Sequence, residues 1–311
     1  IYWHVVAGAA EARIAALVAA ENEKGAQVAV ARIVRHGFPA LMRLELQGLS
    51  YAPARGSWSA TSARADLHIA LTNPQHVKLE SKAPIEVSRA NGAVTRIAAD
   101  ALIASLRSEG GALAAAGVEA TNLTLDDPAA AGVLAVRNMV ANLRPDARAV
   151  GEYQLALELG HLTLPRPVRS FEAFGLEIAA LRAAIVVEHG AALLSEGGGD
   201  PLGPWREAGG KLRFEALGLE WGALQAQGSG QGGLDDQRRL AGALTLPIEH
   251  PGPVFSALAN GPNVNENTRR ALGLLAAGYT LSGDDITLDV EAEDGVLRLE
   301  GVGLRLLPPV Y

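Results

Sequence analysis

The chain of 311 residues contains no cysteine, so disulfide bonds and thiolate chemistry are excluded. Large side chains are also scarce: aromatic residues make up only 5% of the sequence and methionine occurs twice, although 49% of the residues are hydrophobic. Much of that hydrophobic fraction is alanine. This composition predicts either a thinly packed core or a long sheet of little thickness.

An excess of basic charge is missing as well. The formal net charge is −7 and the isoelectric point is about 5.6. Nucleic acids and anionic lipid surfaces are recognised through basic faces. The acidic balance therefore argues against nucleic acid as a partner.

The sequence has no apolar run as long as the roughly 20 residues of a membrane-spanning helix. It begins at Ile1-Tyr2-Trp3-His4 rather than at methionine. Tryptophan and tyrosine are enriched where proteins meet a membrane surface. We expect these residues to be the downstream edge of a removed signal or anchor segment; the alternative is an ordinary soluble protein that has been trimmed.

Motifs that carry chemistry are missing too. Neither HExxH nor GxSxG occurs, and the seven histidines are scattered and expected on the surface or in turns. Three acidic doublets are expected in solvated turns, with a loose calcium site as the alternative: Asp126-Asp127, Asp235-Asp236 and Asp284-Asp285. The sequence therefore predicts a protein that is not an enzyme and that uses no cofactor and no metal.

The most regular stretch runs from Leu212 to Ile248 and predicts a meander of strands. Apolar residues stand at even positions up to Ala216 and at odd positions from Leu217, which indicates a β-bulge between them. Glycines at 228, 230 and 233 resemble a dinucleotide fingerprint, but a strand rather than a helix follows them. We therefore interpret Gly228–Gly233 as a hairpin turn.

Two other segments share the pattern of 212–221, in which Arg and Glu alternate with apolar residues before a Gly-Leu pair. They are 42–51 and 297–306. The alternation changes phase beside the Gly-Leu pair in all three, and glycine is favoured where strands bend. We interpret the pattern as a recurrent curved strand, which arose either by internal duplication or by convergence.

Helices are expected in only two regions. An alanine-rich segment with apolar residues at three- and four-residue steps predicts a helix over Val5–Glu23, ended by Gly25. A helical pair is expected at Val254–Ala259 and Asn265–Ala277, with Asn263 or Asn265 as the N-cap and Gly278 as the stop. The glycine-rich segment 195–210 is expected to be a loop.

Alternating segments fill most of the remaining chain, about twelve strands in all. One strand is expected over Val77–Val87, a strong hairpin signal at Asn91-Gly92 follows, and a second strand is expected over Val94–Leu106. So few helices do not fit parallel βαβ units. The predicted fold is therefore mainly β (α+β): a long, strongly curved antiparallel sheet that forms a groove or half-barrel, packed by the N-terminal helix and the C-terminal helical pair.

We expect two halves, residues 1–150 with the N-terminal helix and a sheet, and residues 151–311 with the helical pair 254–277, continuous with the first. A curled sheet of one layer leaves an apolar concave face that the helices cover only in part. This groove is either filled by side chains or holds an apolar ligand. The residues that we expect in the groove or at its rim are Phe38, Trp58, Phe214, Trp221, Phe255, Leu258, Leu272 and Leu275.

Several short motifs in this order resemble one bacterial envelope family. They include His36-Gly37-Phe38-Pro39, Ser57-Trp58-Ser59-Ala60, Asn73-Pro74-Gln75-His76-Val77 and Leu219-Glu220-Trp221-Gly222. Over nearly its whole length the chain resembles the proteobacterial family catalogued as domain of unknown function 2125. Its ending Leu306-Leu307-Pro308-Pro309 resembles AsmA-like proteins, a broader set of β-rich envelope proteins linked to lipid traffic.

The resemblance implies an N-terminal membrane anchor upstream of this chain, with the body in the periplasm of a Gram-negative bacterium, and it implies no catalytic residues. Together with the predicted groove, it favours a lipid- or hydrophobic-ligand-binding protein in envelope lipid transport or homeostasis. The alternative is a non-catalytic structural or assembly factor that binds a protein partner through strand edges or helices.

Overall fold

The computed structural model describes residues 2–37, 41–54, 58–70, 72–130, 132–169, 171–194, 202–261 and 264–310. The chain divides into two compact units, Ile1–Arg144 and Pro145–Tyr311, called unit 1 and unit 2 below. The division lies a few residues before the boundary expected near residue 150. Each unit is described by itself.

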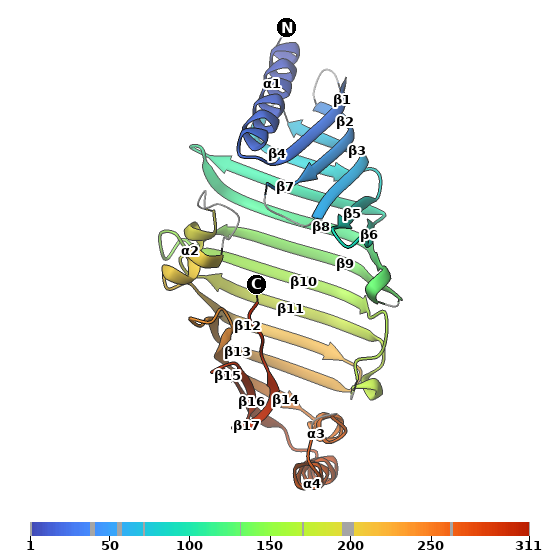
Figure 1. Ribbon diagram of the computed structural model, residues 1–311, viewed down its shortest axis with the longest axis vertical. Helices are drawn as coiled ribbons and strands as arrows, with labels where there is room; N and C mark the ends of the chain where they lie inside the picture. Colours follow the sequence, from blue (N-terminus) through green and yellow to red (C-terminus); the bar gives the residue numbers. More distant parts are fainter. Residues whose placement is uncertain are drawn as a thin grey trace. The chain divides into compact units, whose positions relative to one another are not determined.

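Unit 1 consists of one helix and a sheet of antiparallel strands (Figure 1). Helix α1 (Tyr2–Glu23) precedes β1 (Gln27–His36), β2 (Leu41–Ala52), β3 (Trp58–Ala70), β4 (Asn73–Ser81), β5 (Ile85–Arg89), β6 (Val94–Ala98), β7 (Ala101–Glu109), β8 (Ala112–Asp127), the short helix η1 (Pro128–Ala130) and β9 (Gly132–Pro145). Strand β3 follows β1 and β2 and pairs along its length with both β4 and β5. The sheet then continues through β6 and β7 to β8 and β9.

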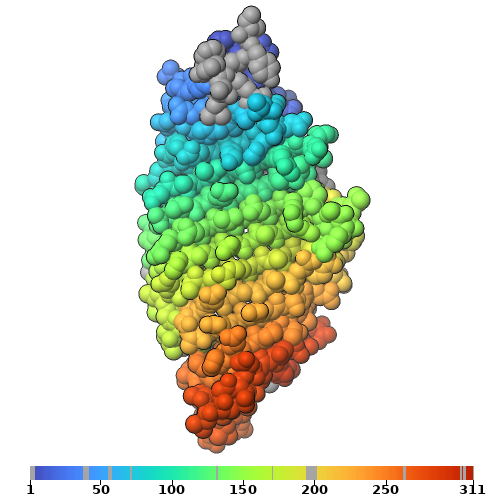
Figure 2. All heavy atoms as spheres, turned by 180° about the vertical axis from the view of Figure 1, so that it is seen from behind, coloured from blue at the N-terminus to red at the C-terminus, as the bar shows by residue number. Residues whose placement is uncertain are grey.

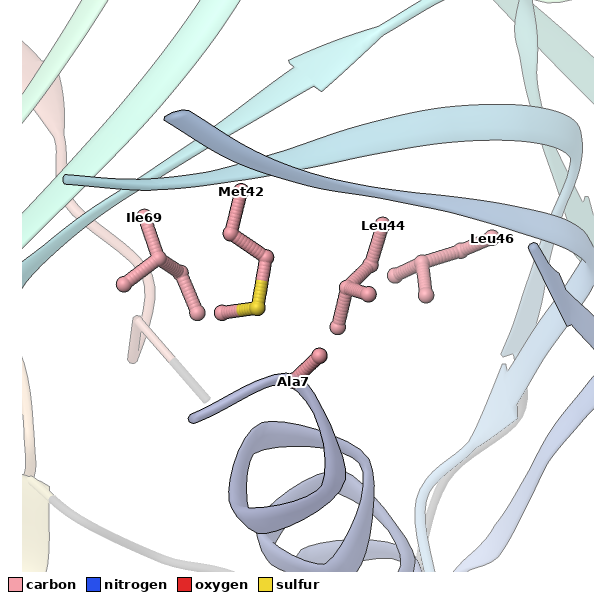
Figure 3. Packing of buried hydrophobic residues seen from close by; sticks show 5 residues of the cluster. All are labelled: Ala7, Met42, Leu44, Leu46 and Ile69. Atoms are coloured by element: carbon pink, nitrogen blue, oxygen red, sulfur yellow. The ribbon is translucent and has the colours of Figure 1, made fainter. Parts of the chain in front are cut away.

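The core of unit 1 lies between α1 and the sheet. Ala7 of α1 faces Met42, Leu44 and Leu46 of β2 and Ile69 of β3, and all five side chains are buried (Figure 3). Val6, Ala10 and Ile14 of the helix pack around this contact as partly buried neighbours. Burial of Met42 and Leu44 contributes about 1.5–3 kcal/mol for each side chain.

Unit 2 is a meander of antiparallel strands with a helical pair inserted before its last three strands. After β10 (Tyr153–Thr163) come η2 (Glu172–Phe174), β11 (Glu177–Val187), η3 (Gly190–Leu194), α2 (Leu202–Glu207), β12 (Lys211–Trp221), β13 (Leu224–Leu234), β14 (Leu240–Glu249), α3 (Gly252–Ala259), α4 (Glu266–Ser282), β15 (Ile286–Glu293), β16 (Val296–Leu299) and β17 (Val302–Leu306). Each strand from β10 to β16 pairs antiparallel with the next. Helices α3 and α4 interrupt this order between β14 and β15, and they pack on each other.

The predicted fold class is confirmed: the chain is mainly antiparallel β, with an N-terminal helix and a C-terminal helical pair. The predicted bulge is confirmed as well, since the pairing of β12 with β13 shifts between Phe214 and Leu217. Asn265 is the N-cap of α4, and its side-chain oxygen accepts a hydrogen bond from the Thr268 amide at 2.9 Å.

Glycine misled the prediction at three places. The segment Gly228–Gly233 is not a turn but lies inside β13, with ladder partners on both sides. The segment 297–306 is not one curved strand, because it folds back at Glu300-Gly301 into the hairpin β16–β17. Helix α4 passes through Gly278 and ends at Gly283, which adopts the left-handed conformation (φ 70°).

Three further expectations were wrong in detail. The strand expected over Val77–Val87 is divided into β4 and β5 around Pro84, and Val94–Leu106 is divided into β6 and β7. Part of the loop expected over 195–210 is helix α2, while residues 195–201 lie outside the described residues. Leu17 is one of the apolar residues whose three- and four-residue steps predicted helix α1 and a buried stripe on it, and it is 53% exposed.

Two glycines allow β13 and β14 to approach each other closely. Gly230 (φ 156°) and Gly242 (φ 153°) adopt a backbone conformation that L-residues rarely take. A Cβ atom on Gly230 would lie 2.2 Å from the carbonyl oxygen of Ala243, and one on Gly242 would lie 2.3 Å from that of Gln231. The glycines are therefore required at these two ladder positions.

We expect Gly230→Ala to destabilise the protein by about 2 kcal/mol or more, because the new methyl group forces both strands apart and strains the backbone. The matched control is Gly218→Ala in β12, where the nearest atom to a new Cβ is 3.8 Å away. The control is expected to leave stability unchanged or raise it by up to about 1 kcal/mol. Equal urea midpoints for the two variants would contradict this account.

Candidate functional site

A hollow in unit 2, the unit 2 pocket, follows from the residues that share one rung of the sheet. A rung is a row of paired residues on neighbouring strands whose side chains point to the same face. One rung carries Gly232 on β13, Gly242 on β14 and Ala292 on β15, between Leu212 and Leu297 at its two ends. At this rung the three middle strands thus carry almost no side chain, and a cavity of about 470 Å³ lies over it.

Larger apolar groups form the walls of the unit 2 pocket. Phe214, Leu244 and Val290 come from the next rung, and Trp205 comes from α2. The Trp205 ring is buried and fixed, since its Nε1–H donates a hydrogen bond to the carbonyl oxygen of Glu188 at 2.7 Å. The pocket walls are therefore held in place before any ligand binds.

A strap formed by residues 307–310 borders the same pocket. The Leu307 amide donates to the carbonyl oxygen of Gly295 at 2.7 Å, and the Val310 amide donates to that of Arg238 at 2.9 Å. The strap thus runs from the β15–β16 turn to the β13–β14 turn. Its Leu307 and Val310 side chains complete the apolar lining.

Unit 1 has a hollow of the same kind, the unit 1 pocket, of about 350 Å³. Its floor is formed by small residues on β3 and β4, and its lining includes Ala60, Ser62, Ala65 and Ser81. Tyr51 is paired with Ala60, and Leu49 with Ser62, so large side chains on β2 stand beside small ones on β3. The Ser62 and Ser81 hydroxyls donate to the carbonyl oxygen of Ala83, which leaves a mostly apolar surface.

Among the residues that the structure describes, none that lines either pocket is charged. In unit 1 the charges gather on other residues of β1–β4, where an acidic rung lies between two basic ones. The acidic rung is Glu45, Asp66 and Glu80; the basic rungs are His36, Arg43, His68 and Lys78 on one side and Arg32, Gln47 and Arg64 on the other, with Gln47 uncharged. The two faces of the sheet differ because successive side chains point to opposite faces.

Hydrogen bonds and nearby cations stabilise this acidic rung. The amide of Gln47 and the neighbouring Arg64 and His36 hold the pKa of Glu45 below its usual value. The Lys82 ammonium does the same for the pKa of Glu80. Asp66 is fully buried and lies 3.6 Å from Arg64 and 3.8 Å from Arg43, but its oxygens accept no hydrogen bond from the described residues.

The residues predicted for the groove do not meet at one place. Phe214 lines the unit 2 pocket. Trp58 is 42% exposed and packs on Tyr51, a residue of the unit 1 pocket, with 5.5 Å between the ring centroids. Phe38 lies outside the described residues.

The other five predicted residues lie away from both pockets. Trp221 belongs to an aromatic cluster with Phe171 and Phe174, and its Nε1–H donates to the carbonyl oxygen of Gly175 at 3.0 Å. Phe255 is buried in α3 and stacks on Tyr279 of α4, with ring centroids 5.5 Å apart. The remaining three are on the helical pair: Leu258 and Leu272 are half-buried, and Leu275 is 44% exposed.

The sequence reasoning missed the small residues that make the hollows. It looked for large apolar side chains as ligand contacts, whereas the floor of each pocket consists of glycine, alanine and serine. The available signal was the run of glycines in 228–233 followed by Gly242. Read as a strand, this run predicts a stretch of sheet without side chains.

The described residues form neither a metal site nor a membrane-spanning helix. Within the ranges that the structure describes, no group of three His, Asp or Glu side chains is arranged to hold a metal ion. None of the helices in the described part of the chain is both long enough and apolar enough to span a bilayer.

Fold and site together define a mainly antiparallel β protein with two apolar pockets, one in each unit. The chain belongs to the family described as uncharacterized protein conserved in bacteria (DUF2125), whose model matches residues 3–308. No curated protein and no solved structure matches the chain. The family resemblance seen in the sequence is thus confirmed, and the AsmA-like resemblance of the ending is not.

Filling the unit 2 pocket tests whether it is a true hollow. We expect Ala292→Leu to leave the free energy of unfolding unchanged or raise it by up to about 1 kcal/mol, because the longer side chain enters empty space. The matched control is Ala180→Leu on β11, a buried position outside the pocket lining, where overpacking costs about 1–3 kcal/mol. A loss of that size in Ala292→Leu, measured by urea denaturation, would show that the pocket is already filled.

Proposed function

We propose that this protein binds a lipid or another apolar ligand in its two pockets. The observation that carries the proposal is that each pocket is an apolar hollow with a floor of small residues, and that its lining contains no charged residue in the described part of the chain. Their volumes of about 350 and 470 Å³ fall within the range of small-molecule sites. Such a surface favours alkyl groups and provides few hydrogen-bonding partners for a polar substrate.

Burial of alkyl groups would supply the binding free energy. Each methylene that leaves water contributes about 0.8 kcal/mol, so a sixteen-carbon chain gains on the order of 10 kcal/mol before ordering costs are subtracted. Rigid walls such as the hydrogen-bonded Trp205 ring reduce the part of that cost that comes from ordering the protein.

We further propose that the ligand is handled in the envelope of a Gram-negative bacterium, in lipid transport or homeostasis. The protein would face the periplasm and be held by an inner-membrane anchor upstream of this chain. Membership in a bacterial family is compatible with this setting. The AsmA-like resemblance of the ending adds an analogy to lipid traffic, which is a weaker argument than the pockets.

The first test is native mass spectrometry of the purified protein, followed by organic extraction and identification of lipids. We expect a co-purified lipid at one or two molecules per chain. An apo mass, together with no uptake of a fluorescent sixteen-carbon fatty acid or a fluorescent phospholipid, would refute the proposal and favour a structural or assembly factor.

Variants locate the binding within the chain. Ala292→Leu in the unit 2 pocket and Ala60→Leu in the unit 1 pocket are each expected to weaken uptake of the fluorescent fatty acid at that pocket by roughly tenfold. The reason is that displacement of one or two methylenes costs about 0.8 kcal/mol each. The double variant should lose uptake.

Matched controls place the same leucine at exposed alanines outside the pockets. Ala216→Leu on β12 and Ala63→Leu on β3 are expected to bind as the parent does. Equal binding by all four single variants would place the ligand elsewhere on the protein.

A further inference from the structure

Helix α4 is almost uncovered, although twelve consecutive residues of it, 271–282, carry no charge. Ala276 is its one buried residue among those that the structure describes. Leu274 is 76% exposed and Leu281 is 89% exposed. Helix α3 packs on α4, and Figure 1 shows the two helices side by side at the edge of unit 2, in the orange part of the chain that Figure 2 shows from behind. A helix of this composition is normally buried against a partner.

The two most exposed leucines, Leu274 and Leu281, lie on one stripe of α4. Positions 270, 274, 277 and 281 follow one another at steps of four, three and four residues, the spacing that keeps side chains on one side of a helix. The stripe starts with Arg270, whose side chain is 72% exposed. Just beyond the helix lie Asp284 and Asp285, both exposed. One end of the stripe is thus basic, the middle apolar and the other end acidic.

The stripe complements itself when the helix is reversed about the point between Ala277 and Gly278. Reversal brings Leu274 level with Leu281 and Arg270 level with Asp285 just beyond the helix, while Ala277 of the stripe lies next to the centre, level with Gly278. The smallest residues thus fall at the centre, where two helix axes that cross must approach to about 8–10 Å. A surface that complements itself under reversal is what a two-fold interface requires.

A groove beside the stripe complements it under the same reversal. It has a volume of about 600 Å³ and lies between α3 and α4, lined by small or polar residues such as Ala259, Gly273, Ala277 and Thr280, with Leu281 at its edge. In the reversed arrangement a second Leu281 projects near Gly273. One copy therefore offers both the projecting leucine and the hollow that receives it.

We propose that α4 is a docking surface for a second copy of this chain, packed antiparallel on α4 of its partner. Two features favour a second copy over a lipid surface. The ends carry opposite charges that pair across a two-fold axis, and Asp284 and Asp285 would be repelled by anionic lipids. Arg270 bonds Glu266 within its own helix at 3.2 Å, and its further N–H groups leave it able to pair with Asp285 of a partner.

Sedimentation equilibrium of the 311-residue chain tests the proposal. We expect a concentration-dependent monomer–dimer equilibrium, and we expect Leu274→Glu/Leu281→Glu to be monomeric over the same concentrations. The matched control, Leu306→Glu on β17, changes a leucine that is 75% exposed and should dimerise as the parent does. Circular dichroism checks that the variants stay folded, which substitution of such exposed residues leaves intact.

A charge exchange tests the antiparallel arrangement. Arg270→Asp and Asp285→Arg should each weaken dimerisation roughly tenfold, because the two-fold axis doubles each lost ion pair. When the two substitutions are combined in one chain, the dissociation constant of the dimer should return to within about threefold of the parent value.

Three results would overturn the proposal: a parent chain that is monomeric at all concentrations, a dimer that survives the double leucine substitution, or no recovery in the charge exchange. Flotation with phosphatidylcholine vesicles tests the competing possibility that the stripe binds a lipid surface. The stripe would be assigned to a lipid surface instead if the parent chain is monomeric in solution but floats with vesicles, and if the variant Leu274→Glu/Leu281→Glu no longer floats.

Discussion

The constraint on which both units depend is that a sheet of one layer has two faces and only one of them can face water without cost. In unit 2 the outward side chains form cross-strand ion pairs, such as Arg182 with Glu220 at 2.8 Å and with Glu158 at 3.6 Å. In unit 1 the layered rungs around Asp66 do the same. The opposite faces are apolar, and short or small-residue helices cover only part of them.

Local changes of phase keep the apolar side chains on the same face as the strands turn. Leu46 and Leu49 of β2 both pack on the core of unit 1, although their positions differ by an odd number, and Gly48 (φ 61°) lies between them. The bulge between Phe214 and Leu217 serves the same purpose in β12. Each sheet thus bends while one side stays apolar.

Much of the fold could be predicted from the alternation of single strands. The bulge in β12, the N-cap Asn265 and the helix α1 depend on neighbours in sequence, so their signals are local. The true role of Gly228–Gly233 depends on close contact with β14, which no local pattern reveals. Glycine signals a turn when read alone, and it signals a close approach of strands when a partner is present.

The pockets could not be predicted for a related reason. Gly232, Gly242 and Ala292 share one rung only because the register of three strands brings them together, and α3 and α4 intervene between the second strand and the third. The curvature of the sheet predicts a groove, and the structure has a separate apolar pocket in each unit. The residues that line these pockets, apart from Phe214, could not be predicted, because large side chains form the walls of a hollow and small ones form its floor.

The strap that borders the unit 2 pocket is tied to the sheet at two points, with two prolines between them. Pro308 and Pro309 have no amide hydrogen, so within residues 307–310 only Leu307 and Val310 can donate from the main chain, and both already do. These two main-chain hydrogen bonds therefore tie the strap, and neither belongs to a rung of the sheet. Proline restricts the backbone between them, so residues 308 and 309 form a stiff link from one turn to the other.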